Sequence, residues 1–120
     1  MKKIGFILVL LLKMNCIAQN STSHYKKVYP FDIYHKDWAL VKTVADTYGF
    51  INKNGKEVVL TIYSKIYEFE IQKDGIKYAL IRNFAGAFGF INENGKEIVE
   101  GINWKKEEAI QKLNYYINSK

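Results

Sequence analysis

Hydrophobic and polar positions alternate along most of this chain, in short runs separated by turn residues. Runs of this kind predict β-strands, and the clearest are 27–33, 38–43, 65–71 and 77–83. Two Asn-Gly turns, each between β-prone runs, add two hairpins. The pattern thus predicts eight short strands within about 80 residues, with no helical stretch between them. We therefore expect a mainly β fold, built as an antiparallel meander of hairpins.

The period changes after residue 103. Ile110, Leu113 and Ile117 recur at i, i+3 and i+7, and Ala109 extends the same face. This spacing predicts an amphipathic helix over about 104–118. Because the last repeat of a stacked protein needs a cap with a polar outer side, we expect segment 104–120 to cover the apolar face of the final hairpin.

The chain contains two copies of one pattern. Residues 38–59 are identical to residues 78–99 at 12 of 22 positions, and a shorter element at 25–33 recurs at 63–71. The offset is 40 residues for the first match and 38 for the second, so the link inside the second copy is two residues longer. A third copy begins at Ile102 and is then replaced by the helical pattern. We expect two β repeats over 25–103.

These residues resemble the WG repeat, also called the KWG repeat, of bacterial proteins. The motif Gly-Phe-Ile-Asn-x-Asn-Gly-Lys-Glu occurs twice at a fixed spacing, and the resemblance covers about residues 25–104. The Trp of the family is Tyr48 in one copy and Phe88 in the other, and its usual Asp is Asn52 and Asn92. The resemblance implies a repeat of short β-strands that acts as a binding or scaffolding surface.

Two glycines in each copy predict local structure, one in a turn and one inside a strand. In the turns containing Asn54-Gly55 and Asn94-Gly95, Gly supplies the positive φ of a type I turn followed by a bulge. Gly49 and Gly89 lie inside strands, where they indicate close approach by a neighbouring segment. The turns also set a register. We expect four facing pairs: Phe50 with Val58, Tyr48 with Leu60, Phe90 with Ile98, and Phe88 with Glu100.

The N-terminus accounts for half of the net charge. The chain carries +6, but residues 1–18 have the basic start, apolar stretch and small residues of a cleavable secretory signal. Cleavage after Ala18 would remove three lysines and leave +3, with a flexible segment at 19–24. We expect a secreted or periplasmic protein. A lipoprotein signal ending at Cys16 is the alternative, whereas Lys13 interrupts the apolar run too early for a membrane span.

Candidate chemistry is scarce. With one Cys and two His, a zinc site of four Cys or His ligands is excluded, and the chain has neither a nucleophile elbow nor a phosphate-binding loop. We expect no catalytic residue, no metal and no cofactor. Glu57 and Glu97 occupy the same place in each copy, which indicates a structural role. If the protein were a small hydrolase, His35 beside Asp37 would be the pair to test.

Residues that differ between the copies are better candidates for binding. They are His24, His35, Asp46 against Gly86, and Arg82 against Lys42. Adding the aromatic residues of the links, the candidate binding residues are Tyr34, His35, Trp38, Tyr78 and Arg82.

We expect the partner to be another protein or an envelope polymer, engaged by a face or sheet edge that two repeats leave open. Self-association through that edge is a further expectation. Carbohydrate binding is the alternative function, with Tyr34, Trp38, Tyr78 and Tyr115 as stacking candidates. Nucleic acid is disfavoured, because Arg82 is the single arginine and the charge without the leader is low.

Overall fold

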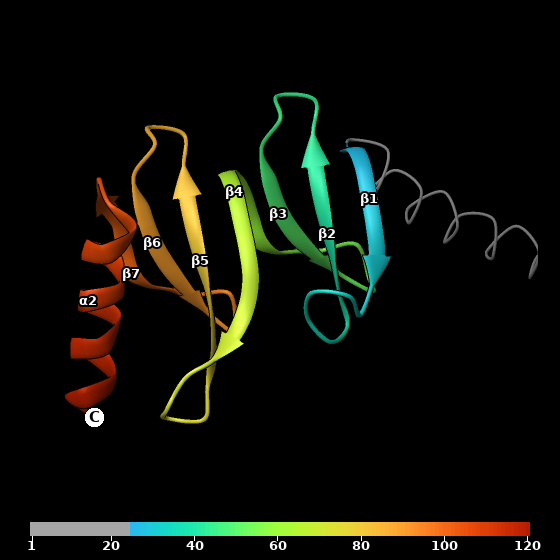
Figure 1. Ribbon diagram of the computed structural model, residues 1–120. Helices are drawn as coiled ribbons and strands as arrows, with labels where there is room; N and C mark the ends of the chain where they lie inside the picture. Colours follow the sequence, from blue (N-terminus) through green and yellow to red (C-terminus); the bar gives the residue numbers. More distant parts are fainter. Residues whose placement is uncertain (1–24) are drawn as a thin grey trace, which may run out of the picture.

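The fold is a single open sheet followed by one helix (Figure 1). The computed structural model describes residues 25–120, so the predicted leader, Cys16, the segment 19–24 and His24 lie outside the described residues. The elements are β1 Tyr25–Phe31, β2 Trp38–Thr43, β3 Tyr48–Asn52, β4 Glu57–Ile71, β5 Lys77–Asn83, β6 Phe88–Asn92, β7 Glu97–Asn103 and α2 Lys106–Asn118. The strands are antiparallel and neighbours in sequence order, which confirms the predicted mainly β meander with a C-terminal helix.

Seven strands form where eight were expected, because β4 is continuous. Its first half pairs with β3 and its second half with β5. No Gly, Pro, Asn or Asp occurs between residues 57 and 71, so nothing in the sequence ends the strand. Near its middle, the Ser64 hydroxyl lies within hydrogen-bond distance of the carbonyl oxygens of Arg82 (3.1 Å) and Asn83 (3.0 Å). The two repeats therefore share one long strand.

The five tight hairpin connections from β2 to β7 use the same five-residue turn. The first N–H donates to the fifth C=O, and the fourth N–H donates back to the first C=O, at 2.8 to 3.0 Å. The fourth residue has a positive φ in every case: Asp46, Gly55, Gly75, Gly86 and Gly95. The Asn52 and Asn92 side chains each accept two backbone N–H bonds inside their turns. These side chains, rather than those of Asn54 and Asn94, accept the turn bonds.

The predicted register was wrong beyond the turns, because β4 and β7 each carry three extra residues opposite β3 and β6, one next to the turn and two farther along the strand. The facing pairs are Phe50 with Val59, Tyr48 with Tyr63, Phe90 with Val99, and Phe88 with Asn103. The bulged backbone folds over Gly49 and Gly89: a Cβ on Gly49 would overlap the Val59 carbonyl oxygen and lie 2.9 Å from the Leu60 carbonyl carbon. Leu60, expected opposite Tyr48, lies instead in the bulge and is 61% exposed.

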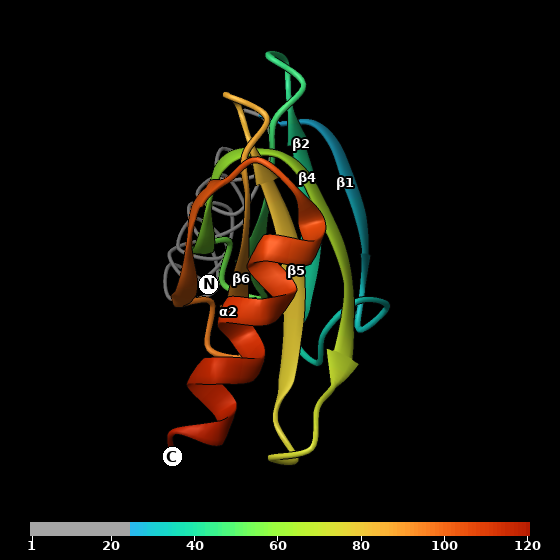
Figure 2. The same cartoon turned by 60° about the vertical axis from the view of Figure 1, so that its left-hand side comes forward.

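The core has two main parts: the first repeat packs on the second repeat, and the second repeat packs on the helix. Residues of the first repeat, including Trp38 and Phe50, share one cluster with Ile81 and Ile91 of the second. The opposite face of the second repeat is covered by α2 (Figure 2), as expected of a cap. The buried stripe of the helix is Ala109, Leu113 and Ile117, spaced i, i+4 and i+8, which turns Ile110 partly toward solvent.

Candidate functional site

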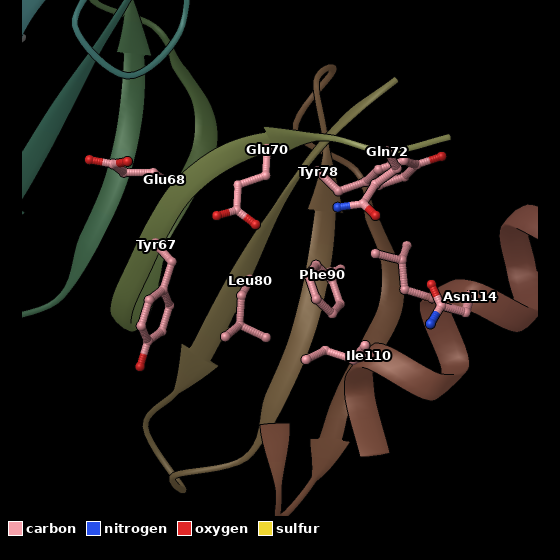
Figure 3. Close-up of a pocket in the computed structure, with 10 residues that line it drawn as sticks. Tyr67, Glu68, Glu70, Gln72, Tyr78, Leu80, Phe90, Ile110 and Asn114 are labelled. Carbon is pink, nitrogen blue, oxygen red and sulfur yellow. The ribbon is translucent and has the colours of Figure 1, made fainter. Parts of the chain in front are cut away.

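A groove separates the second repeat from α2 (Figure 3). Its volume is about 520 Å³, within the range of ligand pockets. The lining residues come from three neighbouring strands, the β4–β5 turn and the helix: Tyr67, Glu68, Glu70, Gln72, Tyr78, Leu80, Phe90, Ile110, Leu113 and Asn114. The floor and the helix wall are mainly apolar, whereas the β4 rim is polar. Such a surface suits a ligand with an apolar body and a charged or polar end.

The β4 rim carries an aromatic ring and two carboxylates. The ammonium groups of Lys65 and Lys106 lie 4.4 and 4.7 Å from the centroid of the Tyr67 ring, so cation–π contacts hold that ring in place. Glu68 and Glu70 are exposed. Within residues 25–120, no hydrogen bond or ion pair joins either carboxylate to another side chain. Their negative charge is therefore available to a ligand.

The end of the groove is fixed by Asp74. The Tyr78 hydroxyl donates to the Asp74 carboxylate at 2.7 Å, and the Lys120 ammonium group donates to the same oxygen at 2.9 Å. Burial raises the pKa of Asp74, but hydrogen bonds from Tyr78, Lys120 and the Ile76 N–H outweigh it and lower this pKa to about 2. These bonds tie the end of α2 to the β4–β5 turn, and so hold two walls of the groove together.

Three of the candidate binding residues form a packed cluster in the first repeat. The His35 and Trp38 rings are stacked, with centroids 3.8 Å apart and planes 13° apart. Tyr34 packs on Phe50, with ring centroids 6.2 Å apart. Trp38 is buried, and the other two side chains are half-buried. The cluster lies away from the groove, since none of these residues lines it.

The proposed His35–Asp37 pair does not form. The two ring nitrogens of His35 face the carbonyl oxygens of Lys36 (2.9 Å) and Glu93 (2.7 Å). The Asp37 carboxylate instead pairs with Lys53 at 3.2 Å. His35 therefore links the first repeat to the β6–β7 turn of the second repeat, a contact that spacing in the sequence did not reveal.

The other copy-specific residues surround the β2–β3 and β5–β6 turns. Asp46 pairs with Lys26 (3.3 Å) and Lys42 (3.6 Å), which lowers its pKa. In the second copy Gly86 replaces Asp46, and the guanidinium of Arg82 donates to the Gly86 carbonyl at 3.4 Å. Lys42 thus pairs with a carboxylate of its own turn, whereas Arg82 bonds to a backbone carbonyl oxygen of the equivalent turn. Tyr78 alone, of the five candidate binding residues, lines the groove.

Glu57 and Glu97 have one repeated structural role. Each accepts a hydrogen bond from a tyrosine hydroxyl, Tyr25 at 2.8 Å and Tyr63 at 2.7 Å. Each also accepts a backbone N–H from the residue four positions on, across the bulge. Burial, together with the bond to a carboxylate, raises the pKa of Tyr25 to about 12, and that of Tyr63 also rises. The carboxylates stabilise the bulges and do not face each other as a catalytic pair.

Two other kinds of site are absent from residues 25–120. Nowhere in this range do three or more His, Cys, Asp or Glu side chains gather as metal ligands. The helix described in this part of the chain is not long and apolar enough to cross a membrane.

Sequence patterns missed the groove because its residues come from separate elements. Tyr67, Glu70 and Ile110 follow the ordinary strand or helix pattern, and none of them differs in a way that marks a site. One signal was present: the longer link of the second copy. That link extends β4 to Ile71 and ends in a tight turn, so it does not fold back over Phe90.

Comparison with known proteins identifies the repeats. A family model described as "WG containing repeat" matches residues 48–83 and 88–102. These ranges contain the Asn-Gly turns, the bulged strands and both strand glycines on which the resemblance rests. Neither the curated proteins nor the solved structures that were searched gave a match. The repeated motifs, the repeated bulges and the family match together identify this chain as a WG-repeat-containing protein.

Proposed function

We propose that this protein is a protein-binding module that engages its partner through the groove beside α2. The observation that carries the proposal is the groove itself: Leu80, Phe90 and Ile110 offer an apolar surface, and Glu68 and Glu70 offer carboxylates at its rim that pair with no other side chain of residues 25–120. A concave surface that combines an apolar floor with a few polar groups is the usual form of a binding site.

The groove is a better candidate than the sheet edge. The outer strand β1 carries Lys26, Lys27 and Pro30, all exposed. Lysines and proline are the devices that protect edge strands from pairing with other chains. The strand is also irregular, with two shifts in its register against β2. Strand addition or self-association at β1 is therefore not the interaction we propose.

Binding also fits the arrangement better than catalysis or sugar recognition does. His35 and Asp37, the pair suggested for a hydrolase, bond to other groups. Among the sugar-stacking candidates, Trp38 is 9% exposed and Tyr78 is 2% exposed, so neither ring offers a free face. Tyr115 is exposed on α2 but does not line the groove. We propose a non-enzymatic module that, with its predicted leader, works at the cell envelope or outside the cell.

Affinity capture with a groove variant tests this function. The tagged protein is recovered from envelope and secreted fractions of its own cells, as the unsubstituted chain, as Ile110→Asp and as Ile62→Asp. Ile110 is 43% exposed in the groove, and Ile62 is 50% exposed in the bulge of β4, so they form a matched pair. We expect proteins bound by the unsubstituted chain to remain with Ile62→Asp and to be lost with Ile110→Asp. Circular dichroism checks that both variants are folded.

Two results would overturn the proposal. One is that the folded, unsubstituted chain enriches no protein beyond a tag-only control. The other is that Ile110→Asp enriches the same proteins as Ile62→Asp, which would place binding elsewhere. Retention of the chain on insoluble polysaccharide, without any enriched protein, would favour carbohydrate binding instead.

A further inference from the structure

The two repeats place the same three side chains in the same arrangement. Tyr29, Leu40 and Phe50 of the first repeat correspond to Tyr67, Leu80 and Phe90 of the second. Leu40 faces Phe50 across the β2–β3 pair, and Leu80 faces Phe90 across the β5–β6 pair. We call each set of three an aromatic frame. The frame of the second repeat lines the groove.

The frame of the first repeat is occupied by a side chain of its own link. The Tyr34 ring packs edge-on against Tyr29, with centroids 6.4 Å apart, and tilted on Phe50 at 6.2 Å. Leu40 lies beside Tyr34 in the same hollow. The chain reaches this position because β1 ends at Phe31 and the link then bends back over the sheet.

The frame of the second repeat lacks such an occupant. Its link ends in the tight turn in which the Gln72 N–H donates to the Ile76 carbonyl, so β4 runs on to Ile71 and past the frame. The helix covers one side through Leu113 but leaves a cavity of about 520 Å³ over Leu80 and Phe90. In the first repeat the ring of a tyrosine thus fills the frame that stays open in the second repeat.

Charge adds a second requirement. In Figure 3 the Glu70 side chain extends over the groove between Tyr67 and Tyr78, and Glu68 lies farther from the helix. Neither carboxylate has an ion-pair partner among the described side chains. In the first repeat the position of Glu70 is taken by Asp32, which has Lys53 at 3.8 Å. A ligand with a cation beside its aromatic ring would supply the partner that Glu70 lacks.

We propose that the groove binds a segment of a partner protein that presents a tyrosine, or a similar aromatic residue, with a basic residue close to it. The ring enters the frame of Tyr67, Leu80 and Phe90, and the basic group pairs with Glu70. This inference rests on the proposed function and names the chemistry of the partner.

The chain's own link supplies the probe. A capped tetrapeptide, Ile-Tyr-His-Lys, has the sequence of residues 33–36 and combines the tyrosine with a lysine. It is titrated into the ¹⁵N-labelled protein and followed by two-dimensional NMR. We expect saturable shifts of the backbone signals of Leu80, Phe90 and Ile110, with a dissociation constant of about 1 mM, as for a short flexible ligand.

Altered peptides and variants separate the two requirements. Replacing the tyrosine of the peptide by alanine is expected to weaken binding at least tenfold. Glu70→Gln is expected to weaken the lysine peptide about two- to fivefold, and to leave a peptide with glutamine in place of lysine unchanged. Glu93→Gln, an exposed position in the β6–β7 turn, is the matched control and should change neither.

Several outcomes would overturn the inference while leaving the proposed function intact. They are no saturable shift, shifts centred outside the groove, or equal binding of the alanine peptide, in each case with protein capture that still depends on Ile110. If N-acetyl-tyrosinamide bound as tightly as the tetrapeptide, the ligand would be a small phenol and not a protein segment. Loss of Ile110-dependent capture itself would overturn the proposed function instead.

Discussion

Two glycines of the hairpin turns share one left-handed backbone conformation but have different surroundings. Gly75 and Gly95 occupy the same fourth position, with φ of 81° and 85°. Around Gly75 a Cβ would meet nothing within 4 Å, whereas at Gly95 it would lie 2.7 Å from the Val58 carbonyl oxygen and 2.9 Å from a Val59 methyl carbon. At Gly75 only the left-handed conformation requires glycine, while at Gly95 the packing of the β6–β7 turn against the first repeat requires it too.

Alanine substitutions should separate these two requirements. Gly75→Ala is expected to lower the free energy of unfolding by about 1 kcal/mol, the cost of a left-handed non-glycine residue. Gly95→Ala is expected to lower it by about 2 to 4 kcal/mol, because the backbone of the turn must also move away from Val58. Urea unfolding followed by fluorescence measures both values. Equal losses would show that the turn does not press on the first repeat.

Among the elements, the bulged strands are held by one repeated bond. The Tyr63 hydroxyl donates to Glu97, the same carboxylate accepts the Gly101 N–H, and Tyr25 and Glu57 repeat the arrangement. Gly89 lets the bulged backbone approach closely. Tyr25 thus stabilises the bulge of β4 through Glu57, and Tyr63 stabilises the bulge of β7 through Glu97.

Removing the tyrosine hydroxyl should destabilise the protein in a pH-dependent way. Tyr63→Phe is expected to lower the free energy of unfolding by about 1 to 3 kcal/mol at pH 7, the usual contribution of a hydrogen bond to a charged group. Because folding raises the pKa of Tyr63, its contribution is fully present below about pH 10 and is lost at higher pH. Urea unfolding from pH 7 to 11 measures the difference between the two proteins. A difference that grows above pH 10 would contradict this account.

Over the part of the molecule that the structure describes, α2 caps the second of the two repeats. It buries Ala109, Leu113 and Ile117 on the last sheet face, and its end is anchored when Lys120 reaches Asp74. The Glu108 side chain also accepts the N–H of Lys105 at the start of the helix. The groove is a product of this capping, because a short helix leaves part of the second aromatic frame uncovered.

The anchor at Asp74 should make stability fall in acid. Its folded pKa of about 2 is below the value of about 4 expected for an unfolded Asp, so its contribution is present above pH 4 and is lost as the pH falls toward 2. We expect Asp74→Asn to melt at a lower temperature than the unsubstituted protein at pH 6, with the gap closing toward pH 2.

Melting curves from pH 2 to 7, followed by circular dichroism, test this expectation. Asp46→Asn is the control, because the Asp46 side chain is 64% exposed against 11% for that of Asp74, so its ion pairs contribute less. A gap of the same size at pH 2 and pH 6 would mean that the Asp74 charge does not anchor the helix.

The sequence alone determined the elements of this protein, because they depend on neighbours along the chain. Asn-Gly turns, alternation within strands, the repeat at an offset of 40 residues and the 3.6-residue period near the C-terminus all predicted features that are present. Gly49 and Gly89 even indicated where two segments approach closely.

Only the tertiary structure determined which residues from separate elements contact one another. The bulges shifted the partner of Phe50 from Val58 to Val59 and that of Tyr48 from Leu60 to Tyr63, since residues can loop out of one strand with no mark in its alternating pattern. His35 bonds to Glu93, 58 residues away, instead of the nearby Asp37. The groove exists because the second link is longer and α2 is placed by Leu113 and Asp74, and such distances between separate elements leave no local pattern.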